Sequence, residues 1–163
     1  MRMPSLLTAA LLTFALASPA AAQTSTQASK GVAKAAGGRT IKITGTEQMK
    51  FDVATITAKP GERLHVVLTA VGSMPKIVMS HNFVLLQQGA DPAAFVTAGS
   101  QYQKTDYIAP ESKNDVIAAT GMAGGGETVE VAFKAPMKPG EYTYLCTFPG
   151  HLAGGMKGTL VVK

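Results

Sequence analysis

The chain has 163 residues, of which 46% are hydrophobic and 15% are charged, a composition that suits one folded domain with tails. Its single cysteine excludes an internal disulfide, a zinc site built on paired cysteines and an iron–sulfur cluster held by this chain alone. The formal net charge is +5, but residues 40–163 hold 11 basic and 10 acidic side chains, so no nucleic-acid partner is expected.

The N-terminus has the pattern of an export signal. Arg2 supplies a positive charge, residues 6–17 are apolar, and Ala20-Ala21-Ala22 offers the small residues that a signal peptidase requires. The apolar stretch is shorter than the roughly 20 residues that span a bilayer, although a retained membrane anchor is the alternative. We therefore predict a signal peptide over residues 1–22, export to the periplasm, and no stable membrane insertion after cleavage.

Residues 23–39 are rich in Ala, Ser, Thr, Gln and Gly and show no apolar periodicity, which indicates a flexible linker. The folded domain is predicted to run from Thr40 to Lys163.

Alternation with a period of two residues dominates this domain. Apolar and polar residues alternate at Ile41 and Ile43, in one segment from Phe51 to Thr57, and over residues 64–69, where His65 lies on the more polar face. Further predicted strands cover residues 83–86, 116–118, 128–133, 141–146 and 157–162. Many short strands separated by turn residues predict a β-sandwich or barrel.

One stretch departs from this pattern. Asp91-Pro92 is a typical helix start, with Asp as the cap and Pro in the first turn, and the alanines that follow favour a helix ending near Gly99. We predict a partly helical insertion over residues 90–107.

A short loop near the C-terminus combines three metal-binding side chains. Cys146, His151 and Met156 supply a thiolate, an imidazole and a thioether within one loop between two predicted strands. With a second imidazole, these ligands suit copper in both oxidation states, as in blue-copper sites. The chain has three histidines, and His81 lies at the head of a strand, where it can reach this loop. We interpret His65, in the middle of a strand, as a surface residue.

The sequence closely resembles the azurin and auracyanin group of type 1 copper proteins. The resemblance rests on residues 146–158 and 79–85, and extends through 43–49 and 139–144. It implies a cupredoxin fold, a Greek-key β-sandwich of about eight strands. It also implies a trigonal copper site of His81, Cys146 and His151 with Met156 as axial ligand.

The resemblance assigns supporting roles as well. It implies that Asn82 links the two ligand loops by hydrogen bonds and that Phe148 lies beside the ligands. Four residues separate His151 from Met156, as in auracyanins and plastocyanins, whereas azurins have three. Ser80 stands where azurins carry a glycine whose carbonyl approaches copper, so a weak contact from the Ser80 carbonyl is expected.

These features predict an electron carrier that cycles one copper ion between Cu(I) and Cu(II). The family resemblance implies that His151 is the electron port, surrounded by an apolar docking patch: Met74, Met79, Phe148, Pro149, Gly150 and Leu152. The expected partners are transient redox proteins, such as cytochromes or copper or haem reductases, and the protein is expected to be a monomer.

Two other functions are less compatible with the sequence. An enzyme of the copper nitrite reductase or multicopper oxidase kind needs more histidines than the three present, so no enzymatic activity is expected. A periplasmic copper chaperone or storage protein is the main alternative. Such proteins tend to have open runs of Met and His, which this chain lacks.

Overall fold

The computed structural model describes residues 38–163, and the predicted signal peptide and residues 23–37 of the predicted linker lie outside this range. The described part contains eleven strands, one α-helix and two 3-10 helices. The strands are β1 (Arg39–Thr46), β2 (Lys50–Phe51), β3 (Thr55–Ala58), β4 (Arg63–Ala70), β5 (Ser80–His81), β6 (Val84–Leu86), β7 (Val116–Ala119), β8 (Ala123–Gly124), β9 (Thr128–Lys134), β10 (Gly140–Leu145) and β11 (Lys157–Val162). The helices are α1 (Pro92–Gly99), η1 (Gln103–Thr105) and η2 (Pro110–Asp115).

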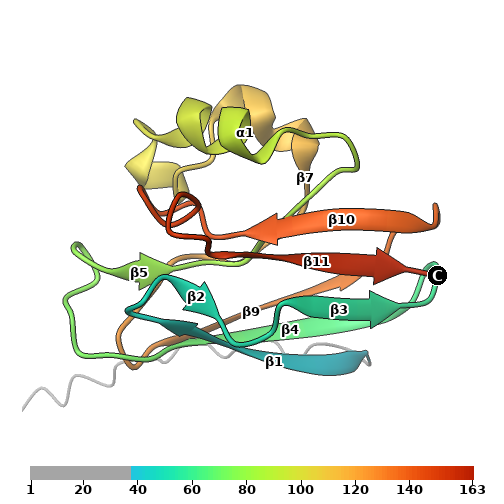
Figure 1. The fold of residues 1–163 in the computed structure, drawn as a ribbon, viewed down its shortest axis with the longest axis horizontal. Helices are drawn as coiled ribbons and strands as arrows, with labels where there is room; N and C mark the ends of the chain where they lie inside the picture. Colours follow the sequence, from blue (N-terminus) through green and yellow to red (C-terminus); the bar gives the residue numbers. More distant parts are fainter. Residues whose placement is uncertain (1–37) are drawn as a thin grey trace, which may run out of the picture. The chain divides into compact units, whose positions relative to one another are not determined.

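The strands form two main sheets, which face each other as a sandwich (Figure 1). One sheet has the order β2-β1-β4-β9 and the other has the order β3-β11-β10-β6-β7, while β5 and β8 form a separate short pair. Strands β1 and β4 are parallel, as are β3 and β11, and the remaining pairs are antiparallel. The two main sheets hold nine strands, of which β2 has two residues and the other eight are longer, in line with the expected number of about eight.

The space between the sheets is filled by the inward side chains of alternating strands. In β4, Leu64, Val66 and Leu68 are buried, while His65 and Val67 face the other side and are only half-buried, as the alternation predicted. Aromatic rings add to this core: the ring of Phe83 lies 5.0 Å from that of Tyr144, centre to centre. A core of aliphatic and aromatic side chains fixes the strands in one register, because a slip by one residue would turn every inward side chain outward.

The segment predicted as one strand from Phe51 to Thr57 is two strands in different sheets. Strand β2 pairs with β1, and β3 pairs with β11 in the opposite sheet. The chain crosses between the sheets after Asp52, whose carboxylate accepts a hydrogen bond from the Thr44 amide at 2.6 Å. The buried positions change phase at this crossing, so that Ile56 and Ala58 face the core while Thr55 and Thr57 are exposed.

The helical insertion lies where it was expected and is longer than expected. Asp91 caps α1 by accepting hydrogen bonds from the amides of Ala93 and Ala94. Helix α1 buries Phe95 against Val84, Leu86 and Leu145, on the outer face of the five-stranded sheet (Figure 1). The additional 3-10 helix η2 extends the insertion to Asp115.

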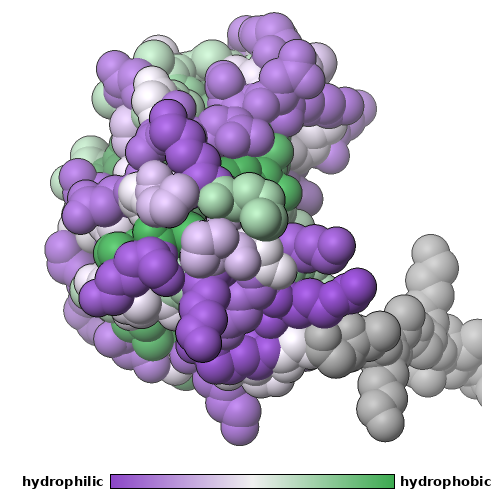
Figure 2. Space-filling view, turned by 90° about the vertical axis from the view of Figure 1, so that its right-hand side faces the viewer, coloured by the Kyte–Doolittle hydropathy of each residue, from purple (hydrophilic) through white to green (hydrophobic). Residues whose placement is uncertain are grey.

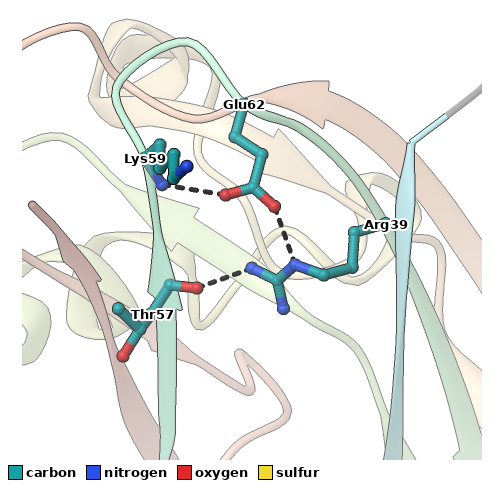
Figure 3. Close-up of polar contacts among 4 residues, drawn as sticks. All are labelled: Arg39, Thr57, Lys59 and Glu62. Atoms are coloured by element: carbon teal, nitrogen blue, oxygen red, sulfur yellow. Dashed lines mark hydrogen bonds and ion pairs between the residues drawn. The ribbon is translucent and has the colours of Figure 1, made fainter.

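An arginine holds the beginning of β1. Strand β1 begins one residue before the predicted domain start, because Arg39 is anchored by two contacts (Figure 3). Its Nε lies 2.7 Å from a Glu62 carboxylate oxygen, and its guanidinium donates to the Thr57 carbonyl at 2.6 Å. The other oxygen of Glu62 accepts the Lys59 amide, so the side chain of Glu62 joins β1 to the turn after β3. The Arg39 ion pair holds the pKa of Glu62 below its usual value.

The two ends of the sandwich differ in their surfaces. The end that carries the C-terminus is largely hydrophilic, with small hydrophobic areas (Figure 2). At the opposite end lie β5 and the loop between β10 and β11 (Figure 1). Exposed hydrophobic side chains precede β5 at Met74, Ile77 and Val78. No helix among residues 38–163 is long and apolar enough to cross a membrane.

Candidate metal centre

Three predicted ligands from two parts of the chain meet at this end of the sandwich. His81 ends β5, and Cys146 and His151 lie on the loop that follows β10. The Nδ1 atoms of the two histidines are 3.3 Å apart, and Cys146 Sγ lies 3.4 Å from His151 Nδ1. The candidate donor atoms of the three residues all lie within 4.8 Å of one another. All three side chains are buried, with residue exposures of 0 to 2%.

The loop from Cys146 to Met156 is closed by its own backbone. The Cys146 amide donates to the Met156 carbonyl at 3.2 Å, and the Met156 amide donates to the His151 carbonyl at 2.9 Å. Gly150 and Gly155 adopt positive φ angles of 85° and 89°, which other residues adopt only with strain. These bonds and turns bring three candidate ligands that are separated along the chain to one side of the loop.

Met156 is fully buried and lies beside His81. An ideal Cβ on Gly45 of β1 would be 3.0 Å from Met156 Cε and 3.0 Å from His81 Cδ2, so both side chains pack against this glycine. A side chain at position 45 would therefore intrude between them. Near Cys146 lies the carbonyl oxygen of Ser80, 3.8 Å from Sγ, and the Ser80 hydroxyl contacts the sulfur of Met122.

Asn82 joins the two ligand-bearing segments. Its side-chain oxygen accepts the Thr147 amide at 2.9 Å, and its side-chain nitrogen donates to the Thr147 hydroxyl at 2.8 Å. The same hydroxyl donates to the Asp106 carbonyl at 2.6 Å. Asp106 and Tyr107 both have positive φ angles, at the turn that ends η1. The helical insertion is thereby attached to the residue after Cys146.

Aromatic packing continues this support. The ring of Phe148 lies 4.7 Å from that of His151, and the ring of Tyr107 meets Phe148 edge-on at 5.6 Å. His65 is elsewhere: its Nε2 lies 2.7 Å from a Glu130 carboxylate oxygen on the neighbouring strand β9. Of the three histidines, His81 and His151 thus form the cluster, and His65 is a half-buried strand residue in polar contact with Glu130.

The sequence and the structure were compared with known proteins. Residues 39–163 match the sequence profile of copper binding proteins, plastocyanin/azurin family. The chain belongs to this family. It is 42% identical to azurin from Pseudomonas aeruginosa over 127 residues, which cover 76% of this chain and 84% of that azurin.

Solved structures of auracyanins are similar to this plastocyanin/azurin family member. Auracyanin A from Chloroflexus aurantiacus, described as a blue copper protein, superposes with a TM-score of 0.70 at 33% identity, covering 78% of this chain and all of the auracyanin. Reduced auracyanin from Roseiflexus castenholzii gives a TM-score of 0.64 at 32% identity over 78% of this chain and 99% of that chain. The cupredoxin fold expected from the sequence is thereby confirmed.

The cluster fits the copper ion of the family. Two nitrogens bonded to one ion at about 2.0 Å lie roughly 3 to 3.5 Å apart, in line with the 3.3 Å between the two Nδ1 atoms. His81 Nδ1 is the ring nitrogen that faces His151, so it is the atom placed to bind a metal, whereas His81 Nε2 is buried without a hydrogen-bond partner among the described residues. A thiolate, two imidazoles and a nearby thioether are blue-copper ligands, and copper is the cofactor that this donor set selects.

The residues predicted to form the docking patch differ in exposure. Pro149 and Gly150 are exposed, Met74 is 42% exposed, and Met79, Phe148 and Leu152 are half-buried. His151 itself is 2% exposed, slightly more than the other three predicted ligands. The most exposed apolar side chains at this end were missed in the sequence: Ile77 and Val78 are 67% and 57% exposed. Both residues lie in an irregular loop, where no alternation of apolar and polar residues indicates which side chains are exposed.

Burial holds both histidines of the metal-free cluster neutral. It lowers the pKa of His151 to about 4, helped by the neighbouring His81, and it also lowers the pKa of His81, against a smaller opposing effect of Glu47. Burial raises the pKa of the Cys146 thiol to about 11. Without metal the cluster is therefore an uncharged thiol facing two uncharged rings, and metal binding must displace the thiol proton.

We expect acid to destabilise the metal-free protein through His151. Because the folded pKa is lowered, the unfolded chain binds the proton more readily, so the neutral ring stabilises the fold fully above pH 6.5 and this contribution is lost as pH falls to about 4. The expected loss is roughly 2 to 4 kcal/mol in the free energy of unfolding, measured by denaturant titration at pH 7.5 and pH 4. The loss should be smaller in His151→Gln and unchanged in His65→Gln. Equal losses of stability in the unmodified protein and in both variants would show that His151 is not the source of the acid sensitivity.

Proposed function

We propose that this protein carries single electrons through one type 1 copper ion held by His81, Cys146 and His151, with Met156 as axial ligand. The observation that carries the proposal is the convergence of the Cys146 sulfur and two histidine nitrogens in a buried cluster of a family member. Bound copper supplies one-electron chemistry between Cu(I) and Cu(II). The Ser80 carbonyl, 3.8 Å from Cys146 Sγ, is the candidate for a weak additional contact.

The protein residues contribute rigidity and exclusion of water. The loop is held by the Asn82–Thr147 hydrogen bonds and by backbone bonds between Cys146, His151 and Met156. Ligands held in this way move little when the charge of the ion changes, which is what fast electron exchange requires. With residue exposures of 2% or less, the four candidate ligands are shielded from water, which suits the role of an electron carrier.

The route to partners runs through the surface above His151. Phe148 covers the His151 ring, and the exposed Pro149 and Gly150 lie next to them in the chain. Together with Met74, Met79 and Leu152, these residues form an apolar patch suited to brief docking, because few charges are available to hold a partner. Transient redox proteins, such as cytochromes or copper or haem reductases, fit this surface. The signal-like residues 1–22 support export to the periplasm, and a monomer suits such an exposed patch.

Copper loading of the metal-free protein tests this function. Addition of one equivalent of Cu(II) is expected to give an intense visible charge-transfer band and a narrow copper hyperfine splitting in electron paramagnetic resonance. Both should persist in His65→Gln, because His65 lies outside the cluster. A pale solution with ordinary tetragonal copper parameters would refute the electron carrier and favour copper transport or storage.

A further inference from the structure

The turn between β1 and β2 contacts the ligand loop through a lysine. Lys50 opens β2, 104 residues before Gly154, and its Nζ donates a hydrogen bond to the Gly154 carbonyl at 2.7 Å. Gly154 precedes Met156 by two residues, in the loop that has four residues between His151 and Met156. Among the described residues this ammonium is the partner of that carbonyl. A charge-assisted bond of this kind is stronger than one between neutral groups.

The same turn packs on the ligand loop from one side. Met49 has a positive φ of 56°, and its Cε and Sδ would lie 3.0 Å from an ideal Cβ on Gly154. On β1, Gly45 touches both His81 and Met156, as described above. The β1–β2 region therefore packs against the Met156 side of the cluster. Lys50 is the charged residue in this packing.

The charge of Lys50 is not neutralised by a neighbour in the described structure. The lysine and arginine ion pairs found among residues 38–163 involve Arg39 and Lys76, and Lys50 takes part in neither of them. A positive charge beside the metal loop favours the less positive oxidation state of a bound ion, by Coulomb's law. Because Lys50 is exposed, salt screens this effect.

We propose that Lys50 is a positioning residue for the Met156 side of the site that would hold copper. It holds the Gly154–Met156 segment in place through the Gly154 carbonyl, and its ammonium raises the reduction potential by favouring Cu(I). This inference rests on the proposed electron-carrier function and adds to it a residue outside the ligand set. Sequence reasoning missed Lys50 because the contact joins segments that are far apart in the chain.

Two substitutions test the hydrogen bond and the charge of Lys50 together. Lys50→Met removes both, whereas Lys50→Arg keeps the charge and a donor. Lys42→Met is the matched control, because Lys42 is an exposed lysine of β1 with no polar side-chain contact in the described structure. Thermal unfolding of all the variants establishes that they are folded.

Two measurements on the full-length protein test the proposal. The reduction potential of the copper form should fall in Lys50→Met, by less at high salt than at low salt, and should stay near the native value in Lys50→Arg and Lys42→Met. In the metal-free protein, hydrogen exchange at the Met156 amide should be roughly tenfold faster in Lys50→Met, as expected from the loss of one hydrogen bond to a charged group.

The outcomes distinguish this inference from the proposed function. A type 1 spectrum combined with a native potential and native exchange in Lys50→Met would overturn the role of Lys50 and leave the electron carrier standing. Equal shifts in Lys42→Met would also overturn it, because the effect would then be one of general surface charge. Absence of a type 1 spectrum in the unmodified protein would remove the proposed function and this inference with it.

Discussion

Cys146→Ser is expected to abolish the intense visible absorption of the copper-loaded protein. The band arises from charge transfer between a thiolate sulfur and Cu(II), and a serine hydroxyl stays protonated and binds copper weakly. We expect the narrow hyperfine splitting to disappear with the colour, and the copper affinity to fall by several orders of magnitude. Visible absorption, electron paramagnetic resonance and a competition titration with a copper chelator measure these three effects.

The fold should survive this substitution. The thiol has 0% exposure and lies 3.4 Å from His151 Nδ1, so the smaller hydroxyl has an acceptor at hand. We therefore expect the metal-free variant to lose no more than about 1 to 2 kcal/mol in the free energy of unfolding. A folded serine variant that kept the intense band would show that Cys146 is not the thiolate ligand. A variant that failed to fold would be replaced by Cys146→Ala.

Gly99→Ala is expected to destabilise the protein and disturb the copper site from a distance. Gly99 ends α1, and a Cβ added there would lie 2.0 Å from the carbonyl oxygen of Tyr107. This backbone has little freedom to move, because the preceding Asp106 carbonyl accepts the Thr147 hydroxyl at 2.6 Å. Displacing the turn would strain or break this bond next to Cys146. Overpacking of this kind costs about 1 to 3 kcal/mol, and contact with backbone places it at the upper end.

A second glycine provides the control for this prediction. Gly121 is also near Asp106, but its added Cβ would meet only a carboxylate oxygen at 3.9 Å. We expect Gly121→Ala to change the free energy of unfolding by less than about 0.5 kcal/mol. Denaturant titration compares the two variants, and electron paramagnetic resonance of the copper forms shows whether only Gly99→Ala changes the metal site. Similar free energies of unfolding for both variants would contradict the prediction and show that the backbone at Asp106 and Tyr107 can move to accommodate the added methyl group.

Strands with one face in the core could be predicted well from the sequence. Strand β11 has the predicted bounds, β9 ends one residue later than predicted, and β10 begins and ends one residue earlier than predicted. Every second side chain of these strands packs between the two sheets, so apolar and polar residues alternate visibly in the sequence. The crossing between the sheets after Asp52 could not be predicted from such a pattern, because it depends on hydrogen bonds to Thr44 in another strand. The short polar helix η2 has no apolar periodicity to reveal it.

Some residues of the candidate site could likewise be predicted from the sequence and others could not. Cys146, His151 and Met156 were visible because thiolate, imidazole and thioether side chains are rare and were grouped in one loop. Lys50 and Ile77 were not visible, since lysines and loop isoleucines are common and their roles depend on what lies next to them in space. Metal ligands can be recognised from residue type alone, whereas the residues that pack around them can be recognised only from the folded structure.

The position of β11 in its sheet has a consequence for how the protein matures. This strand comes last in the chain, yet it lies between β3 and β10, and its partner Thr55 is far from Thr159 in sequence. The five-stranded sheet is incomplete until residue 162 has been synthesised, and pairings of such separation form slowly. Because Cys146 and His151 lie on the loop between β10 and β11, their relative positions are fixed only when these two strands pair. The ligand loop therefore reaches its closed form, with the Cys146 amide bonded to the Met156 carbonyl, only once β11 has docked.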